Sequence, residues 1–183
     1  MKSASWNING INSRLEHVVK WSLAVRPDVL CLQETKCVDA KFPVSKLQAA
    51  GYEYVEFYGE KSYNGVAILS KVPLTEVRKG FPNDTADAPT RLIEARANGV
   101  AVVCAYYPHG TKIGSDKIRF KLDWVAHLRK YFDELHDNDD LVLLCGDTNI
   151  TPHEMDLWNV RYWATRMHFT REERDVFLEL KRW

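Results

Sequence analysis

The sequence lacks the features that mark secreted and membrane proteins. None of its four cysteines forms a Cys-x-x-Cys pair, and no apolar run approaches the length of a membrane span. The first residues contain no apolar stretch long enough for a signal peptide. Three of the cysteines lie inside apolar runs, where cysteine is typically a small buried hydrophobic residue. We therefore expect a cytoplasmic protein that has no contact with a membrane.

The sequence also lacks an excess of charge of either sign. Its 25 basic and 25 acidic residues give a formal net charge of +0, so no global basic field indicates a nucleic-acid partner. A basic groove on one face is still compatible with this total. The six histidines are scattered and none makes a pair with metal-binding spacing, which argues against zinc. With 183 residues, of which 45% are hydrophobic, the chain suits one ordinary globular domain.

Hydrophobic periodicity predicts many strands with a few helices between groups of them. Apolar and polar residues alternate over 2–9, which is typical of a half-buried strand. Ser13 and Glu16 form a capping-box pattern that predicts the start of a helix, and Asn98-Gly99 predicts a tight hairpin turn. Further strands are predicted over 29–32, 51–57, 66–69, 74–79, 91–97, 100–107 and 141–145, and helices over about 44–50, 118–135 and 172–183. This pattern favours packed sheets that carry helices on their outer faces.

Two of these predictions concern burial. Five apolar residues in a row predict that the strand 141–145 is buried on both faces. The long helix is predicted to be amphipathic, with its apolar residues on one face. Its basic residues are expected to face solvent, namely Lys117, Lys121, Arg129 and Lys130.

Polar residues follow several of the predicted core strands. Asp147 and Asn149 come directly after the strand 141–145, and Glu34 follows the strand 29–32. Asn7 and Tyr106 lie in the same way near the ends of two further strands. One interpretation is a site, because a carboxylate beside apolar packing must be paired, metal-bound or solvated in a cleft. The alternative is that Asp147 and Asn149 only begin a turn.

These strand-end residues suit a hard cation if the strands are neighbours. One carboxylate with amide oxygens and water is the ligand set expected for Mg²⁺, which takes few protein ligands and keeps several waters.

Five motifs in order along the chain resemble the exonuclease III family of abasic-site endonucleases, within the endonuclease/exonuclease/phosphatase superfamily. The motifs are Trp6–Gly10, Leu32–Lys36, Lys61–Ser70, Tyr106–Gly110 and Gly146–Asn149. The resemblance implies a four-layer α/β sandwich of two packed sheets flanked by helices. It also implies Mg²⁺-dependent hydrolysis of DNA, with Mn²⁺ as the alternative metal. The expected reaction is cleavage of the phosphodiester 5′ to an abasic site, with 3′-exonuclease activity, on double-stranded DNA that carries abasic sites or 3′ ends.

The same resemblance implies roles for individual residues. Glu34 resembles the family's Mg²⁺ ligand, and Asn7 the amide close to it. Asp147 resembles the residue that orients or deprotonates the attacking water, and Asn149 the amide that holds the scissile phosphate. Tyr106 resembles the active-site tyrosine. Contacts to the substrate are expected from residues beside the motif loops, namely Lys61, Asn64, Arg91 and Lys112.

The family pattern continues beyond Trp183, so residues 1–183 are expected to form a single endonuclease/exonuclease/phosphatase domain that is incomplete at its C-terminus. The family's terminal histidine and the aspartate that orients it have no counterpart here, and neither His153 nor His168 replaces them. We therefore expect weak hydrolysis by the isolated chain. A free sheet edge would then be open to a partner or to a second copy of the chain.

Two other functions remain open at this stage. One is a catalytically incomplete module that binds nucleic acid without cleaving it. The other is a phosphodiesterase of the same superfamily with a different substrate, such as a lipid or inositol phosphate.

Overall fold

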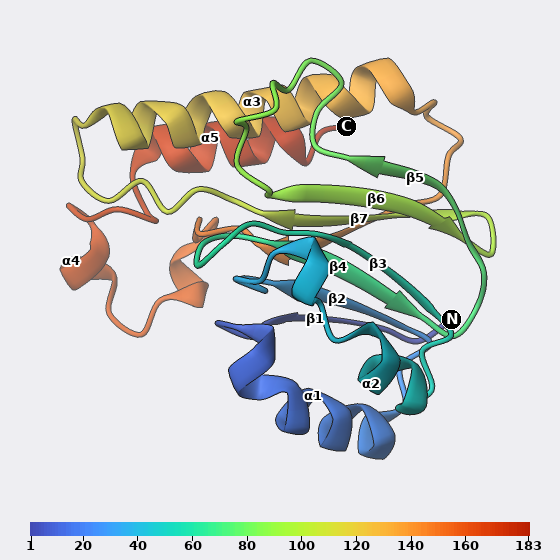
Figure 1. Ribbon diagram of the computed structural model, residues 1–183. Helices are drawn as coiled ribbons and strands as arrows, with labels where there is room; N and C mark the ends of the chain where they lie inside the picture. Colours follow the sequence, from blue (N-terminus) through green and yellow to red (C-terminus); the bar gives the residue numbers. More distant parts are fainter. The chain divides into compact units, whose positions relative to one another are not determined.

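The computed structural model describes residues 1–183, which contain two four-stranded sheets and five α-helices (Figure 1). The chain divides into two compact units, and each is described by itself. The first unit consists of Met1–Tyr106 and Asp140–Asp147, and the second of Tyr107–Asp139 and Thr148–Trp183. The predicted α/β class with two sheets is confirmed. No helix combines the length and the apolar character that a membrane span requires.

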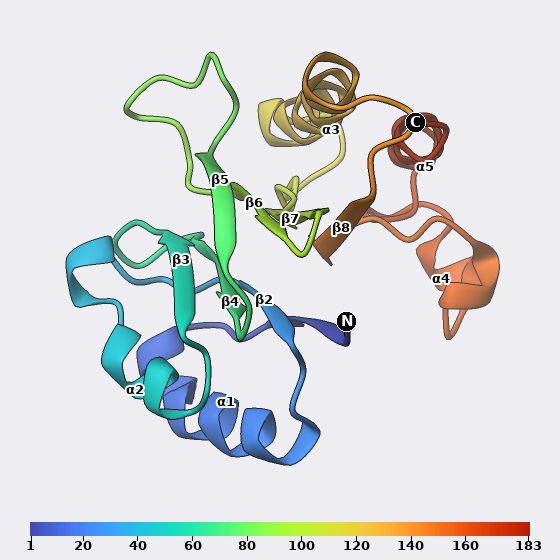
Figure 2. The same ribbon diagram turned by 90° about the vertical axis from the view of Figure 1, so that its right-hand side faces the viewer.

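Sheet A lies in the first unit and has the strand order β1-β2-β4-β3. Strands β1 and β2 run parallel, and the other neighbours run antiparallel. Helices α1 and α2 lie on the face of sheet A that points away from sheet B (Figures 1 and 2). The elements are β1 (Ser3–Asn7), α1 (Ile11–Val25), β2 (Val29–Gln33), the 3₁₀ helix η1 (Asp39–Lys41), α2 (Val44–Ala49), β3 (Tyr54–Tyr58) and β4 (Val66–Ser70).

Sheet B belongs to the same unit and has the order β5-β6-β7-β8. Its strands are β5 (Leu74–Lys79), β6 (Leu92–Ala97), β7 (Val100–Tyr106) and β8 (Val142–Asp147). The predicted turn at Asn98-Gly99 joins β6 to β7, and both of its residues have positive φ (50° and 79°), as this kind of tight turn requires. Strands β7 and β8 run parallel.

The two sheets pack face to face over an apolar core (Figure 2). Fully buried β-branched residues dominate this core, because their side chains fit the pleated surface of each sheet. Cys31 from sheet A and Cys104 from sheet B contribute to the core, and Cys145 packs against it. All four cysteines have free thiols, and only Cys145 is partly exposed, which confirms their prediction as small apolar residues.

The second unit is helical. Its two longer helices, α3 (Asp116–Leu135) and α5 (Arg171–Leu180), lie side by side (Figures 1 and 2). The 3₁₀ helix η2 (Glu154–Asp156) and the short helix α4 (Val160–Trp163) precede α5. A capping box at Thr170 and Glu173 begins α5, in which each side chain accepts a hydrogen bond from the other residue's backbone.

Three expectations from the sequence are wrong. Helix α1 begins at Ile11, before the proposed capping box, and the Ser13 hydroxyl donates to the Gly10 carbonyl. Strand β8 is only partly buried, because it is an edge strand of sheet B and has one neighbour. Lys121 of α3 is completely buried and does not face solvent, because it forms an ion pair with α5.

Candidate active site

Four residues predicted from the sequence meet at one end of the two sheets in the first unit. Asn7 and Tyr106 are the last residues of β1 and β7, Asp147 is the last residue of β8, and Glu34 follows β2 directly. Parallel pairing brings the carboxyl ends of β1 and β2 together, and likewise those of β7 and β8. The convergence that the sequence could only assume is therefore present in the fold.

Asn7 is the centre of this cluster. Its side-chain amide donates one hydrogen bond to Glu34 Oε1 and another to Asp147 Oδ2, both 2.8 Å long. A neutral amide carries two N–H donors, so it can satisfy both carboxylates without changing their charge. The amide thus holds two negative groups close together that would repel each other if nothing lay between them.

Glu34 receives two further hydrogen bonds. The Tyr106 hydroxyl donates to Oε1 at 2.8 Å, and Lys36 Nζ lies 2.7 Å from Oε2. Burial raises the pKa of Glu34, but the hydrogen bonds from Asn7, Lys36 and Tyr106 outweigh it and lower the pKa below its ordinary value. Glu34 is therefore ionised at neutral pH and able to serve as a ligand for a cation.

Lys36 was not among the predicted site residues. Besides its contact with Glu34, it donates to the Asn9 side-chain oxygen at 2.5 Å. The sequence shows the motif that contains Lys36. A single lysine after a strand is usually an ordinary surface charge, so the sequence did not single it out.

The backbone at Glu34 has a conformation that few residues other than glycine adopt. Its φ is 54°, in the left-handed region, and two backbone hydrogen bonds hold the loop there. Gly10 N–H donates to the Glu34 carbonyl at 2.7 Å, and Thr35 N–H donates to the Gly65 carbonyl at 3.1 Å. A Cβ on Gly65 would lie 2.1 Å from the Thr35 hydroxyl, so this contact requires glycine. The fold therefore maintains a strained loop that aims the carboxylate, as functional sites often do.

Tyr106 ends β7, the strand next to β8, and contacts both carboxylate-bearing strand ends. It is the register partner of Asp147, and a Cβ on Gly146 would lie 1.9 Å from the Ala105 carbonyl, so glycine is needed for the close approach of β8. Burial, followed by the hydrogen bond to Glu34, raises the pKa of Tyr106 well above its ordinary value. Its hydroxyl therefore stays protonated at neutral pH and donates the hydrogen bond to Glu34.

Two of the predicted substrate contacts lie beside this cluster. The Arg91 guanidinium lies over the Tyr106 ring at 4.8 Å and donates to the Tyr106 carbonyl at 3.2 Å. The Asn64 carbonyl accepts from Lys36 N–H at 2.9 Å, and the Asn64 side chain donates to Glu60. Lys61 is exposed on the same loop and contacts none of the clustered side chains.

The remaining predicted residues, Asn149 and Lys112, belong to the second unit. Asn149 has a φ of 48°, and its side-chain amide donates to the Tyr107 carbonyl at 3.0 Å. Its own carbonyl accepts from Lys121 Nζ at 2.5 Å and lies 2.6 Å from His168 Nδ1. Lys121 and His168 thus both hold the backbone carbonyl of Asn149 in place.

Lys121 is the central cation of the second unit, and sequence reasoning missed it. Its Nζ lies 2.5 Å from Glu173 Oε1, and neither side chain is exposed. The available signal was helical spacing, because Ile118, Val125 and Leu128 occupy the same face of α3 as Lys121 and are buried. A lysine on that face must be paired, since a lone buried charge is strongly unfavourable.

A chain of hydrogen bonds connects Asn149 to the loop that carries Lys112. His168 Nε2 lies 3.2 Å from His109 Nε2, and His109 Nδ1 accepts from Thr111 N–H at 3.3 Å. These contacts assign the tautomers: His109 donates from Nε2, and His168 donates from Nδ1 to the Asn149 carbonyl.

The cluster in the first unit fits a hard cation. Glu34 and Asp147 supply carboxylate oxygens, which are the ligand type that Mg²⁺ prefers. Asn7 lies between them with its N–H groups toward both carboxylates, and its side-chain oxygen accepts from Asn9 N–H at 3.1 Å. No group of three or more histidine, cysteine or acidic side chains gathers in a way that would hold a metal. A cation here would therefore keep several waters in its coordination shell, as Mg²⁺ commonly does.

Comparison with known proteins identifies clear relatives. Residues 4–176 match the model of the Endonuclease/Exonuclease/phosphatase family. The chain is 35% identical over 162 residues to exodeoxyribonuclease III of Haemophilus influenzae, which covers 86% of this chain and 60% of the relative. It is 32% identical over 184 residues to the DNA repair nuclease APEX1 of Danio rerio, which covers 98% of this chain and 59% of the relative.

The fold also matches a solved structure. An AP endonuclease from Archaeoglobus fulgidus superposes with a TM-score of 0.95 at 35% sequence identity, over 100% of this chain and 70% of that one. The chain thus spans about three fifths of the length of the two curated relatives.

Proposed function

Because this chain belongs to the Endonuclease/Exonuclease/phosphatase family, and within it to the exonuclease III group, we propose that it forms the catalytic portion of a DNA repair nuclease. Its proposed reaction is hydrolysis of the phosphodiester 5′ to an abasic site, with removal of nucleotides from 3′ ends. One observation carries the proposal: the Asn7 amide holds Glu34 and Asp147 together at the ends of parallel strands.

In the proposed reaction, Asp147 accepts the proton of a water molecule. The water oxygen forms a bond to phosphorus, the bond from phosphorus to the 3′ oxygen breaks, and a 3′ hydroxyl is released after protonation. A carboxylate within reach of the water contributes about a hundredfold to ten-thousandfold as a general base. Asn7 supports this role because its donated hydrogen bond fixes the orientation of the Asp147 carboxylate.

We propose Mg²⁺ as the cofactor, with Mn²⁺ as the alternative, held by Glu34, with Asn7 close to it in the same metal site. When bound, the metal offsets the negative charge that grows on the phosphoryl oxygens. Lys36 and Tyr106 fix the orientation of the Glu34 carboxylate through their contacts with its two oxygens. The lowered pKa of Glu34 supports the assignment, since only the ionised carboxylate binds a cation well.

Five further residues are proposed to contact the substrate. Asn149 donates to the scissile phosphate, and Arg91, Lys61, Asn64 and Lys112 contact the DNA backbone. The proposal for Asn149 is supported by its fixed backbone. The proposal for Arg91 is supported by its position over the Tyr106 ring. Each positive charge that meets a phosphate adds to affinity and to its dependence on salt.

The proposed partner is double-stranded DNA, and the proposed location is the cytoplasm, which agrees with four free thiols. The exposed edge of β8 is the proposed place for pairing with a further β-segment or a second copy of the chain.

A duplex with one abasic analogue, labelled at its 5′ end, tests the proposed function. We expect Mg²⁺-dependent nicking that chelation abolishes and that Glu34→Gln and Asp147→Asn each reduce by at least about a hundredfold. Glu56→Gln on β3 is the matched control, since this carboxylate lies outside the cluster. Cleavage by either the Glu34 or the Asp147 variant at the rate of the unaltered chain would contradict the assigned site.

The alternative is a module that binds nucleic acid without cleaving it. Salt-sensitive binding of the duplex with no nicked product, at any Mg²⁺ or Mn²⁺ concentration, would favour this alternative.

A further inference from the structure

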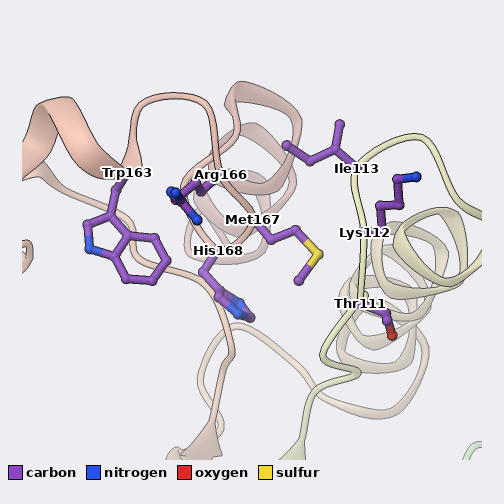
Figure 3. Close-up of a pocket in the computed structure, with 7 residues that line it drawn as sticks. All are labelled: Thr111, Lys112, Ile113, Trp163, Arg166, Met167 and His168. Carbon is purple, nitrogen blue, oxygen red and sulfur yellow. The ribbon is translucent and has the colours of Figure 1, made fainter.

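The second unit contains a cavity of about 390 Å³ that none of the proposed catalytic residues lines (Figure 3). One wall is the loop that carries Lys112 and Ile113, and the facing wall is the segment with Trp163, Arg166 and Met167. Two cations therefore come from opposite walls, and no acidic side chain lines the space. Neither cation is in an ion pair, so both are available to an anionic ligand.

The cavity also offers apolar surface. Figure 3 shows the Met167 side chain extending into the space between the walls, and the indole nitrogen of Trp163 on the side away from Met167. The carbon edge of the Trp163 ring therefore faces the cavity. A site with cations at its walls and apolar groups between them suits a ligand that is part anion and part flat ring.

A ladder of exposed flat groups adjoins this cavity. Trp158 and Tyr162 have ring centroids 5.5 Å apart, and the Arg166 guanidinium lies 4.0 Å from the Tyr162 ring. Trp158 is 77% exposed and Tyr162 is 44% exposed. Tyr162 also contacts the edge of Trp163, at 5.3 Å between centroids, which connects the ladder to the cavity wall. Exposed aromatic side chains in one place commonly mark a binding surface.

We propose that the cavity and the Trp158–Tyr162–Arg166 ladder bind an unpaired stretch of DNA. A base stacks on the exposed Trp158 ring, which packs against Tyr162, and a backbone phosphate lies between Lys112 and Arg166. Only unpaired nucleotides fit this arrangement, because paired bases are stacked inside the duplex and do not present a free face to a protein ring. The proposal rests on the proposed function only in taking DNA as the ligand, and it requires neither Glu34 nor Asp147.

Fluorescence anisotropy with a labelled oligothymidylate of about 12 nucleotides tests this proposal, with a blunt duplex of equal length for comparison. The assay contains EDTA, so that no cleavage takes place. We expect Trp158→Ala and Tyr162→Ala each to weaken binding of the single strand about tenfold, and binding of the duplex less than about threefold. Trp158→Phe retains a flat ring and should preserve most of the affinity.

A matched pair of charge variants separates this site from general attraction to DNA. Arg166→Ala should lower the affinity for the single strand. It should also lower the magnitude of the slope of log binding constant against log salt concentration by about one. Arg119→Ala removes an exposed cation of α3 that lines no cavity and should have little effect. Equal losses of single-strand affinity in Arg166→Ala and Arg119→Ala would overturn the proposal. So would an unchanged affinity in Trp158→Ala.

Two further measurements keep the outcomes distinct. If thymidine monophosphate competes as strongly per mole as the oligonucleotide does, the site binds free nucleotides. That result would overturn the assignment to a DNA strand. Glu34→Gln should leave single-strand binding unchanged. If Glu34→Gln loses cleavage and still binds the single strand, both proposals are supported. If the unaltered chain binds the single strand and does not cleave the abasic duplex, only the proposed function is contradicted.

Discussion

At the scale of single residues, the candidate site depends on which groups donate hydrogen bonds to the carboxylates. Glu34 accepts hydrogen bonds from a neutral amide, a cation and a phenol, namely Asn7, Lys36 and Tyr106. Together these donors outweigh the effect of burial on the pKa of Glu34. Removing one donor should therefore change the pH at which the carboxylate ionises and leave the fold intact.

The variant Tyr106→Phe tests this by removing a single hydroxyl group. The variant lacks the hydroxyl that donates to Glu34 at 2.8 Å, so the pKa of Glu34 rises toward its ordinary value. We expect the acidic limb of the pH–activity profile to move to higher pH, with activity lowered about tenfold or more at neutral pH. Tyr54→Phe on β3 is the control. An unmoved acidic limb would show that Tyr106 has no influence on the ionisation of the site.

At the scale of elements, one buried ion pair connects α3 to α5. Lys121 and Glu173 are both fully buried, and Lys121 also contacts the Asn149 carbonyl. Taking two charges out of water costs free energy that their attraction offsets only while both are present. The pair therefore couples the packing of the helices to the backbone position of Asn149.

Lys121→Met should lower the free energy of unfolding by about 3–5 kcal/mol, because it leaves the Glu173 carboxylate buried without its cationic partner. The double variant Lys121→Met, Glu173→Leu should recover most of that loss, since no buried charge remains. Chemical denaturation followed by far-UV circular dichroism measures both. Lys130→Met removes an exposed cation of the same helix and should change stability by less than about 1 kcal/mol. A double variant no more stable than Lys121→Met would contradict this account.

The same pair predicts the response of stability to acid. Burial raises the pKa of Glu173, but the hydrogen bond and charge of Lys121 and the hydrogen bonds of Thr170 outweigh it, so the folded pKa lies below the ordinary value of 4.5. A depressed carboxyl pKa stabilises the fold above the unfolded pKa, and this contribution is lost as pH falls through the folded pKa.

Denaturation midpoints measured from about pH 6 to about pH 3 test this prediction. The gap in stability between the unaltered chain and Glu173→Gln should narrow as pH falls. A gap that stays constant over this range would mean that the ionisation of Glu173 contributes nothing to stability.

At the scale of the whole molecule, a net charge of +0 provides little electrostatic repulsion between copies. Strand β8 is an edge strand of sheet B, with Leu144 36% exposed and Leu141, just before the strand, 66% exposed. Unpaired strand edges with apolar side chains favour association with other strands.

Sedimentation velocity should therefore detect association of the isolated chain that increases with concentration. Leu144→Lys should suppress it, because a charge on an edge strand opposes pairing with another strand. Leu23→Lys on α1 alters a leucine that is more exposed than Leu144, at 55% against 36%, and that lies outside any sheet, so it should leave association unchanged. Equal suppression by both variants would indicate general repulsion and not pairing through β8.

The sequence by itself determined the elements and the chemical character of the site. Alternation and apolar runs located the strands, Asn98-Gly99 located the hairpin, and polar residues at strand ends indicated a site. These signals are local, because each depends on residues within a few positions of one another, and period and turn chemistry act over that range. Five motifs in order then indicated the family, which the comparisons confirm.

Only the tertiary structure decided which of these residues meet. The Asn7 amide bonds to Asp147, 140 positions away, because the sheets bring the ends of β1 and β8 together. The strand order likewise places β8 at the edge of sheet B despite its apolar run. Lys121 is a buried cation because it pairs with Glu173 on another helix. Strand order and helix pairing are long-range outcomes, and a side chain's burial follows from its neighbours in space, which local pattern does not specify.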